Sequence, residues 1–274
     1  MVQGAPMIDL DAYFARIGHA GDRSPTLATL RALHRAHPAA IAFENLDPFM
    51  GRPVPLDPAS LMDKLVRRGR GGYCQEQNHL FRGVLEALGF RVTGLAGRVL
   101  QGRAAGTVGG RTHMALLVDL PEGRHIADVG FGGMTLTAPV RLDTEVPQET
   151  PHERFRVMGF EEGYRLDAEI GGAWEALYRF DLVPQYPVDY EIANFYVSTA
   201  PTSPFVTGLI AARAAPDRRL ALAGARFAVH HLGGPTERRE LESSAALRRV
   251  LEEEFLIALP QDSALDQALA RVVS

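Results

Sequence analysis

The sequence predicts an α+β protein in which a helical N-terminal part precedes an antiparallel sheet and a smaller mixed C-terminal part. Apolar residues recur at helical spacing from residue 7 to residue 90. From Arg91 to about Phe195 the pattern changes to period two, with glycine and proline at the turns. After Gly208, strand-like pieces precede one further helix. A chain of 274 residues is long enough for a large core, in one large domain or in two to three small ones.

The first 90 residues predict four helices with short connections, which suggests a small bundle. The first predicted helix covers Asp9 to Ile17, and each of the other three has a start or a stop signal. These signals, in chain order, are Ser24 as N-cap with Pro25 behind it, Pro38 as a stop, Asp57 as N-cap before Pro58, and Gly89 after a helix that follows Cys74. Between the second and third helices, residues 41–49 predict a short apolar loop or turn.

The middle of the chain predicts strands at 91–100, 112–120, 125–129, 153–158, 163–169 and 173–180, which form an antiparallel sheet or a small barrel. Residues 101–110 are rich in Gly and Ala and predict a flexible hairpin tip, and residues 181–210, with four prolines, predict mainly an ordered connector. The last part predicts strands at 218–222 and 225–232 and a helix at 243–255 with Ser243 as N-cap.

Composition excludes several classes of function. A net charge of −4 and a pI near 6.1 give no nucleic-acid signature. A single cysteine forms no intramolecular disulfide, which suits a reducing compartment. The N-terminus has no basic and apolar signal-peptide pattern, and no apolar run approaches the length of a membrane span. We therefore expect a cytoplasmic protein with no nucleic-acid and no membrane partner.

The stretch Arg70-Gly-Gly-Tyr-Cys74-Gln-Glu-Gln-Asn78 predicts a nucleophile. It contains the only cysteine, placed after two glycines that let the chain turn and let a ligand approach. A cysteine at a helix start lies at the positive end of the helix dipole, which favours a thiolate. The alternative is a buried structural cysteine, since free cysteine is often buried. The glycines and the polar run after Cys74 argue against that alternative.

A cysteine nucleophile needs a base and a group that orients the base. His113 lies in an otherwise apolar strand, and Asp128 is a lone carboxylate in the next apolar strand, where an unpaired charge is costly. If the paired residue numbers of this hairpin have an odd sum such as 243, the two side chains share a face and lie diagonally; an even sum separates them. The sequence leaves the parity open. It also leaves open that His113 is a satisfied core histidine and that Asp128 caps a turn.

The other histidines are weaker candidates. His79 follows Cys74 by five residues on the same helix and therefore faces elsewhere. We place His34, His37, His230 and His231 in surface-like or lid segments, and His19, His125 and His152 near turns. A zinc site with Cys74 and His113 would need further ligands, and no Cys-x-x-Cys or His-x-x-x-His spacing occurs, so we expect no metal.

Taken together, these motifs resemble the arylamine N-acetyltransferase family of bacterial type. The resemblance covers the whole chain, and it is carried by Arg70-Gly-Gly-Tyr-Cys74 with Glu76 and Asn78, Arg111-Thr-His113, Asp128-Val-Gly-Phe131-Gly, Phe43-Glu-Asn-Leu46, Asn194-Phe-Tyr-Val-Ser-Thr199, Ser203-Pro-Phe205 and the strand-like Glu237–Leu241. The interval from Cys74 to His113 (113 − 74 = 39 residues) also differs from the roughly 130–150 residues of papain-like enzymes and from the reversed order of caspases.

The resemblance implies a three-domain fold with a cysteine-protease-like triad of Cys74, His113 and Asp128. Residues 1–90 would form the helical bundle with the nucleophile, 91–195 a β-barrel with the histidine and the aspartate, 196–210 an interdomain segment, and 211–274 an α/β lid. It also implies a brace in which Arg70 forms an ion pair with Glu44.

The implied activity is ping-pong N-acetylation of arylamines and arylhydrazines, with acetyl-CoA as cosubstrate, no metal, and a monomer or homodimer as the active form. The implied substrate contacts are Phe43, Phe131, Phe205, Tyr73 and Val99, and the implied CoA contacts are Thr112, Gly130, Gly132 and Gly133, where the glycines would let the pantetheine arm pass close to the backbone.

The chain departs from the family pattern at Ala42, Gln75, Phe195 and Ala200-Pro201, and we expect Gln75 to alter which amines fit. Three alternatives stay open: an amide synthase of the same family that closes a macrolactam from a carrier-bound acyl chain, a non-catalytic binder of aromatic amines or CoA, and a thiol protease or transglutaminase-like hydrolase.

Overall fold

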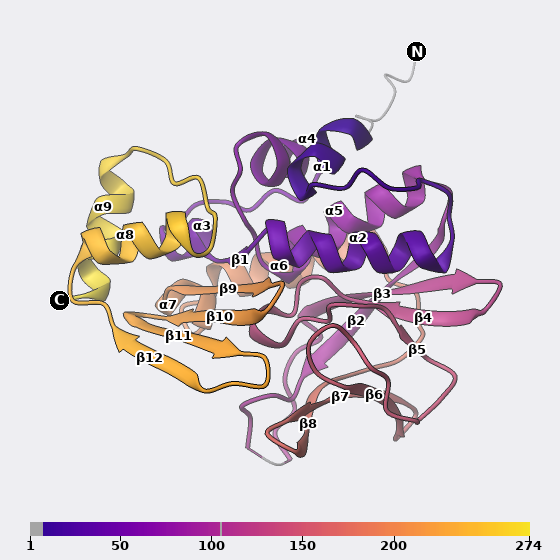
Figure 1. The fold of residues 1–274 in the computed structure, drawn as a ribbon. Helices are drawn as coiled ribbons and strands as arrows, with labels where there is room; N and C mark the ends of the chain where they lie inside the picture. Colours follow the sequence, from indigo (N-terminus) through magenta and orange to yellow (C-terminus); the bar gives the residue numbers. More distant parts are fainter. Residues whose placement is uncertain (1–7, 105) are drawn as a thin grey trace.

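The protein consists of a helical layer, a curled seven-stranded sheet, and a five-stranded sheet that carries two helices (Figure 1). The structure is a computed structural model of the chain and describes residues 8–104 and 106–274. The N-terminal segment 1–7 and one residue of the predicted hairpin tip, residue 105, lie outside the described part. The predicted α+β class, with helices first and strands afterwards, is confirmed.

The helical layer contains the predicted helices and two further short elements. In chain order these are α1 (Leu10–Ile17), α2 (Leu27–Ala40), β1 (Phe43–Glu44), α3 (Leu46–Phe49), α4 (Pro58–Leu61), the π-helix η1 (Met62–Arg67) and α5 (Cys74–Ala87). The predicted cap at Asp57 is confirmed, because its carboxylate accepts a hydrogen bond from a first-turn N–H, and Asp9 caps α1 in the same way.

Helix α2 differs from its prediction at both ends. Its N-cap is Thr26 rather than Ser24, and Pro38 lies inside the helix rather than ending it. A proline in the last turn removes a single helical hydrogen bond, and here its ring is buried. His34 and His37, which we placed at the surface, are also fully buried, one turn apart on the face that meets α5.

Residues 41–49, predicted as a loop, contain β1 and α3. Strand β1 pairs antiparallel with Ala211 and Ala212 of a much later strand and forms a parallel bridge from Phe43 to Gly72. Both partners lie far away in the sequence, so the local pattern carries no sign of the strand. Through these pairings β1 joins the segment before Cys74 to the C-terminal sheet.

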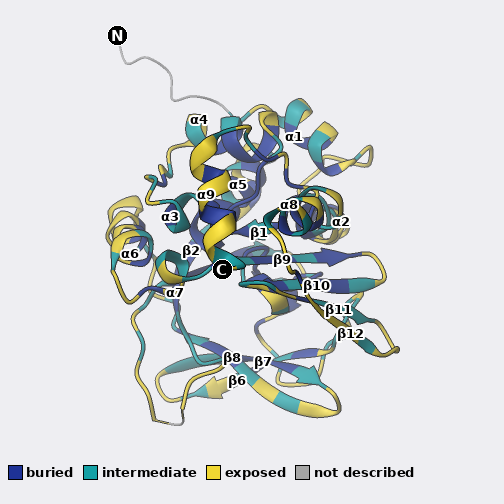
Figure 2. Cartoon of the chain, turned by 90° about the vertical axis from the view of Figure 1, so that its left-hand side faces the viewer, coloured by how far each residue is buried: buried dark blue, intermediate teal, exposed yellow. Residues whose placement is uncertain are grey.

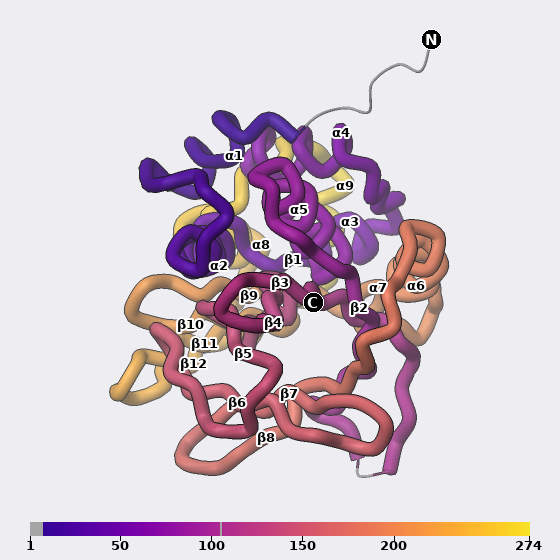
Figure 3. The backbone as a smooth tube through the Cα atoms, turned by 90° about the vertical axis from the view of Figure 1, so that its right-hand side faces the viewer, coloured from indigo at the N-terminus to yellow at the C-terminus, as the bar shows by residue number. Residues whose placement is uncertain are grey.

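The large sheet contains the six predicted strands and one that the sequence did not reveal. Its strands are β2 (Arg91–Val99), β3 (His113–Leu120), β4 (Gly123–Ala127), β5 (Val140–Arg141), β6 (Phe155–Phe160), β7 (Gly163–Ile170) and β8 (Ala173–Phe180), and the short 3-10 turn η2 (Gly132–Met134) follows β4. All neighbours are antiparallel in the order β5-β4-β3-β2-β8-β7-β6, and the two edge strands approach each other, so the sheet is nearly closed into a barrel (Figure 3).

The segment 181–210, predicted mainly as a connector, contains two helices, α6 (Pro187–Thr199) and α7 (Pro204–Thr207). Two of its four prolines, Pro187 and Pro204, stand at first helical positions, where a missing N–H costs nothing, so they begin helices instead of excluding them. Helix α6 runs across residue 195, at which we expect the barrel to end, and the division of the chain into domains stays a prediction.

The C-terminal part contains β9 (Ile210–Ala215), β10 (Arg218–Ala223), β11 (Arg226–His231), β12 (Thr236–Glu240), α8 (Ser244–Glu253) and α9 (Ser263–Val272). The predicted cap of α8 by Ser243 is confirmed, whereas β9 and α9 were not predicted. The five strands follow the order β1-β9-β10-β11-β12, and α8 and α9 cover one face (Figure 1).

Helix α5 lies between these parts. Its side chains Leu80, Phe81, Val84 and Leu85 are fully buried among the N-terminal helices and the inner residues of β3. Figure 2 shows α5 as a largely buried helix inside the molecule. Within residues 8–104 and 106–274, no helix is long and apolar enough to cross a membrane.

Candidate active site

Cys74 is the first residue of α5 and is nearly buried, with 6% of its surface exposed. The N–H groups of a first helical turn have no helical partner and form the positive end of the dipole. One turn in, Glu76 accepts a hydrogen bond of 3.1 Å from the N–H of Tyr73, which fixes where the helix begins. The predicted position of Cys74 at a helix start is confirmed.

The two glycines before Tyr73 are required by the protein itself. A Cβ atom on Gly71 would lie 2.2 Å from the carbonyl oxygen of Ala42, and one on Gly72 would lie 2.6 Å from the carboxylate of Glu76. Neither gap admits a carbon atom. Because protein atoms fill this space, the expectation that these two glycines leave room for a ligand is wrong; they let the loop pack between β1 and α5.

The β3–β4 hairpin brings His113 and Asp128 together. Its paired residues include Leu116 with Ala127 and Leu117 with Ile126, and each pair sums to 243. This is the odd parity that the pairing requires. Accordingly, the Nε2 atom of His113 lies 2.7 Å from Oδ2 of Asp128, and both side chains are buried.

Asp128 is held from all sides. Its second oxygen, Oδ1, accepts hydrogen bonds from the side-chain amide of Asn78 at 2.9 Å and from the N–H of Gly130 at 2.9 Å. Its own N–H donates to Nε2 of His34 at 3.0 Å. Burial lowers the pKa of His34 to about 4, although Asp128 raises it, so the ring is neutral and free to accept that bond. The carboxylate therefore has a single orientation.

The charges of the pair stabilise each other. Burial alone would lower the pKa of His113, but the charge of Asp128 and its hydrogen bond, with a smaller contribution from Cys74, raise that pKa to about 10. Burial would raise the pKa of Asp128, but His113, Asn78 and Gly130 lower it below its ordinary value. The pair is therefore an imidazolium and a carboxylate at neutral pH, with Cys74 beside the imidazolium.

Helix α5 and strand β3 are also tied together next to the sulfur. The Sγ atom of Cys74 lies 3.8 Å from the carbonyl oxygen of Thr112, and the side-chain amide of Gln75 donates to the same oxygen at 3.0 Å. Gln75 is 1% exposed. Since it faces this carbonyl rather than an open pocket, it joins the two elements, and our expectation that it selects among amines is not supported.

Half-buried aromatic rings lie beside His113 and beside the cluster that contains Cys74. Phe131 lies edge-on to the His113 ring, with 5.0 Å between centroids, and Phe43 lies 5.9 Å from Phe205. The ring of Phe43 also faces Gly132, and Val99 is the cross-strand partner of Tyr178, whose ring lies 4.6 Å from His113. The three predicted phenylalanines and Val99 thus lie around one site.

Two other predicted ligand contacts are placed differently. Tyr73 has no exposed surface; its hydroxyl donates to Asn194 and its ring stacks behind Phe205 at 5.2 Å. A Cβ atom on Gly130 would lie 2.9 Å from Cα of Cys74, so protein atoms fill the room expected for a ligand. Gly133 has open space at the corresponding position, as a ligand contact requires.

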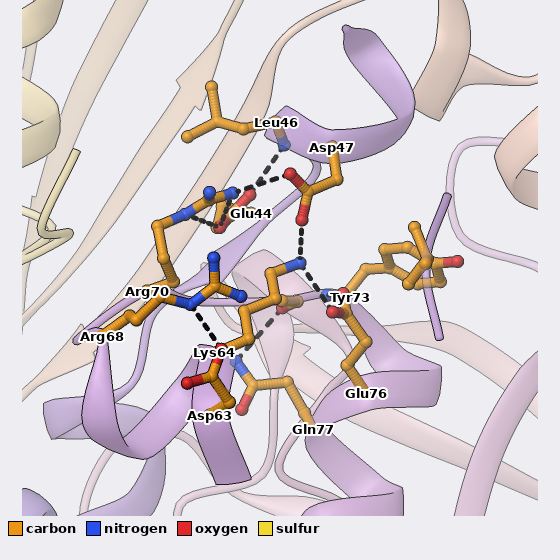
Figure 4. Close-up of polar contacts among 12 residues, drawn as sticks. Glu44, Leu46, Asp47, Asp63, Lys64, Arg68, Arg70, Tyr73, Glu76 and Gln77 are labelled. Carbon is orange, nitrogen blue, oxygen red and sulfur yellow. Dashed lines mark hydrogen bonds and ion pairs between the residues drawn. The ribbon is translucent and has the colours of Figure 1, made fainter. Parts of the chain in front are cut away.

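A buried ionic cluster supports the loop before Cys74 (Figure 4). Its members are Glu44, Asp47, Lys64, Arg70 and Glu76. The Nζ atom of Lys64 lies 2.5 Å from Asp47 and 2.6 Å from Glu76, and Arg70 lies 2.7 Å from Glu44, which confirms the implied brace. The pKa of Glu76 is raised to about 7, mainly because the side chain is buried, and the negative charges of Glu44 and Asp47 raise it further. The positive charge of Lys64 opposes this rise.

Two residues of this site, Asn78 and Tyr178, received no role in the sequence analysis. Asn78 lies one helical turn after Cys74, and that spacing alone places it on the same face. Tyr178 could be suspected from Gly97, a glycine inside a strand, since a Cβ there would lie 3.1 Å from the Tyr178 ring and 3.5 Å from His113. The rival histidine, His79, bonds to the carbonyl oxygen of Gln75 in its own helix and packs on Tyr190, so it faces elsewhere than Cys74, as predicted. Within the described part of the chain, no three His, Cys, Asp or Glu side chains converge to hold a metal ion.

We expect Asp128→Asn to lower the pKa of His113 by roughly 1–3 units, because it removes the nearby opposite charge. The folded-state pKa of His113, about 10, exceeds its unfolded value, so its contribution to stability is complete below about pH 6.5 and disappears as the pH rises through 10. NMR titration of ¹³C-labelled histidine measures the shift. Asp119→Asn, in the same strand as His113, should leave the titration of His113 unchanged. If His113 titrates equally in Asp128→Asn and in the parent, Asp128 is not the group that raises its pKa.

We expect Lys64→Met to lower the free energy of unfolding by about 3–5 kcal/mol, because it leaves buried carboxylates without their counter-charge. Lys64→Met combined with Glu76→Gln should lose less, since one of those charges is then removed. Urea unfolding near pH 7 measures both. Arg68→Met removes an ion pair that is more than half exposed and should cost at most about 1 kcal/mol. If the double variant loses as much free energy of unfolding as Lys64→Met and Glu76→Gln lose when their separate losses are added, the two charges are not coupled.

Comparison with known proteins agrees with this geometry. A family model described as N-acetyltransferase matches residues 26–264. The arylamine N-acetyltransferase of Mycolicibacterium smegmatis is 44% identical over 256 residues, covering 92% of this chain and 93% of that protein, and that of Escherichia coli K12 is 42% identical over 247 residues, covering 90% and 88%. The structure of Mycobacterium marinum arylamine N-acetyltransferase superposes with a TM-score of 0.93 at 44% identity, covering 97% of this chain and all of that one, and its complex with CoA gives 0.92 at 45% identity and the same coverage. On sequence and fold together, the chain belongs to the arylamine N-acetyltransferase family.

Proposed function

We propose that this acyltransferase acetylates arylamines and arylhydrazines by a ping-pong mechanism in which Cys74 carries the acetyl group. The observation that carries the proposal is the position of Cys74, at a helix start and beside an imidazole that a buried carboxylate keeps protonated. Cys74 acts as the nucleophile, His113 as the acid and base, and Asp128 as the group that orients His113.

In the first half-reaction, the Cys74 thiolate attacks the carbonyl carbon of acetyl-CoA. The first-turn N–H groups of α5 lie where negative charge develops on the carbonyl oxygen, and they support it electrostatically. The bond between the carbonyl carbon and the sulfur of CoA breaks, the sulfur of CoA takes the proton of the His113 imidazolium, and CoA departs. The acetyl group is then a thioester on Cys74.

In the second half-reaction, the amine nitrogen attacks the carbonyl carbon of that thioester. Neutral His113 takes a proton from the nitrogen, the bond from the carbonyl carbon to Sγ breaks, and Cys74 leaves as a thiolate. The Cys74 thiolate and the His113 imidazolium are thereby restored. Because Asp128 stabilises the imidazolium, it favours the proton transfer in this step.

The acceptor pocket is built for a flat, uncharged ring. Phe43, Phe131 and Phe205 are all partly exposed around the sulfur and the imidazole, and they offer faces and edges on which an aromatic amine can pack. A weakly basic arylamine is neutral at pH 7, so it needs no carboxylate in the pocket. We assign Val99 to the same wall.

The mycobacterial relative whose structure contains CoA supports CoA as the donor. On this chain we place Thr112, Gly132 and Gly133 along the pantetheine arm. Gly133 has open space beside its Cα, and Gly132, at φ +81°, turns the chain next to Phe43. The conformation at Gly132 is one that residues with a side chain rarely adopt.

We expect the purified protein to form acetylated arylamine and arylhydrazine from free acetyl-CoA, with parallel double-reciprocal plots as ping-pong kinetics require. Chromatography of the product measures the reaction. Asp128→Asn should lower kcat about 10⁴-fold by analogy with other nucleophile–histidine–aspartate triads, and Asp119→Asn should leave kcat unchanged.

The outcomes separate the alternatives. Product formed only when a carrier protein presents the acyl chain would favour the amide synthase. Release of acetate without amide would indicate a hydrolase. No turnover with either donor, together with intact binding of CoA or arylamine, would indicate a non-catalytic binder.

A further inference from the structure

Gln77 holds the two peptide units that precede Cys74. Its side-chain amide donates to the carbonyl oxygen of Gly72 at 3.1 Å, and its backbone N–H donates to that of Tyr73 at 3.0 Å. On the other side of the first unit, the N–H of Tyr73 donates to Glu76 at 3.1 Å. The second unit carries the N–H of Cys74, so Gln77 helps to set the direction of that N–H. Figure 4 shows Gln77 beside Tyr73 and Glu76 at the start of α5.

The surroundings of Gln77 determine which way its amide faces. Carbonyl oxygens of Ala42, Gly72 and Ile41 lie 2.8, 3.1 and 3.3 Å from its Nε2 atom. Carbonyl oxygens only accept hydrogen bonds, so the nitrogen must face them and Oε1 must face the other way. Oε1 lies 2.6 Å from Nε2 of His37 in α2. Since Oε1 also only accepts, His37 is the donor of this bond.

The single proton of the His37 ring therefore lies on Nε2. Burial lowers the pKa of His37 to about 3, although the bond to Gln77 raises it, so the ring is neutral at pH 7. Its Nδ1 atom is then an acceptor, and the hydroxyl of Tyr13 in α1 lies 2.8 Å away and donates to it. The side chains of Tyr13, His37 and Gln77 are all fully buried. Every hydrogen bond in the chain from Tyr13 through His37 and Gln77 to Gly72 thus has one direction.

The other buried histidine of α2 has the opposite tautomer. Nε2 of His34 accepts a hydrogen bond from the N–H of Asp128 at 3.0 Å, so the proton of this neutral ring lies on Nδ1. Among the residues that the structure describes, none is a hydrogen-bond partner of that Nδ1. Two histidines one turn apart on the same helix therefore differ in a property that NMR can observe.

Packing alone does not require this polar chain. The ring of Tyr13 packs edge-on to Phe14, and that of His37 packs edge-on to Phe81, inside the apolar core of the helical layer. Apolar side chains of similar size would fill the same space without needing any partner. A buried polar chain with every bond satisfied instead specifies one arrangement of the groups at its end. Here the group at its end is the carbonyl of Gly72, in the loop before the nucleophile.

We propose that Gln77, oriented by His37 and Tyr13, is a positioning residue for acyl transfer that aims the N–H of Cys74 at the oxygen of the reacting carbonyl. This role depends on the acyl transfer proposed above and extends it to fully buried residues. As the thiolate attacks, negative charge develops on the carbonyl oxygen, and a donor stabilises that charge only if it points at the oxygen. An N–H on a peptide unit that is already fixed needs no reorganisation during the reaction.

Two reactions of the same sulfur atom test this role. Acetylation by acetyl-CoA develops negative charge on a carbonyl oxygen, whereas alkylation by iodoacetamide displaces iodide and develops no such charge. We expect Gln77→Met to lower the single-turnover rate of acetylation roughly 10–100-fold, less than the loss of a whole oxyanion donor, and to leave the rate of alkylation unchanged. Val84→Ala, which removes buried methyl groups from the same helix, should lower the melting temperature and leave both rates unchanged.

The possible results separate Gln77 from the proposed function. If Gln77→Met is acetylated as fast as the parent, the role of Gln77 is wrong. It is also wrong if both rates fall equally, because the substitution then acts on the sulfur itself. In either case the proposed function remains intact. A parent that acetyl-CoA does not acetylate would overturn the proposed function and the role of Gln77 together.

A pair of substitutions at residue 37 tests whether His37 orients Gln77. His37→Leu leaves Oε1 of Gln77 without a donor and should slow acetylation, but less than Gln77→Met, because the amide N–H groups of Gln77 remain. His37→Gln should recover most of the lost rate, since the N–H of a glutamine side chain can reach the place of Nε2 and donate to Oε1. Equally slow acetylation in the two variants would contradict the orienting role of His37.

Nitrogen-15 NMR of the histidine-labelled parent tests the direction of the hydrogen bonds without any substitution and without turnover. At pH 7 we expect the proton of His37 on Nε2 and that of His34 on Nδ1, with the His37 signals identified by their absence from His37→Gln. A proton on Nδ1 of His37 would make its Nε2 an acceptor from Gln77. The oxygen of Gln77 would then face the carbonyls of Ala42 and Gly72, and the proposal would be wrong.

Discussion

The buried pair of His113 and Asp128 is the interaction on which the rest of the site depends. An isolated carboxylate in this position would be costly, and the protein offsets that cost with an imidazolium, an amide, a backbone N–H and a histidine that accepts from the aspartate's own N–H. Each of these partners comes from a different element: β3, α5, the loop after β4, and α2. The orientation of Asp128 therefore requires the helical layer and the sheet to be assembled in one relative position.

Cys74 is held in place by close backbone packing and by buried ion pairs. Gly71 and Gly72 let the loop touch Ala42 and Glu76, and Gly130 lets the chain after Asp128 touch Cys74. Below the loop, Lys64 and Arg70 neutralise the fully buried carboxylates of Glu44 and Glu76 and the mostly buried one of Asp47. Close backbone approach and buried charge both penalise small displacements, so together they restrict where Cys74 can lie relative to His113.

Sequence periodicity was sufficient for the elements whose signals are local. The strand pattern predicted β3 and β4, and the parity of their pairing was the one open question, which the sum of 243 now answers. Prediction failed where burial overrides a local signal, since Pro38 continues a helix with its ring buried and His34 and His37 are interior. It also failed at Pro187 and Pro204, which begin helices rather than exclude them. The two-residue strand β1 depends on partners far away in the sequence, and Tyr178 reaches the site through the register of β8 with β2. No local pattern encodes the pairing of β1, and for Tyr178 the local sequence offers only the glycine at position 97 as a hint.

The measurement that tests the central claim most directly is the intact mass of the protein after rapid mixing with acetyl-CoA and no amine. The account predicts the gain of one acetyl group, its loss when an arylamine is added, and no gain in Cys74→Ala. If the parent gains no acetyl group while Cys74 still reacts with an alkylating reagent, or if Cys74→Ala gains one equally well, Cys74 is not the carrier of an acetyl group from acetyl-CoA and the account is wrong.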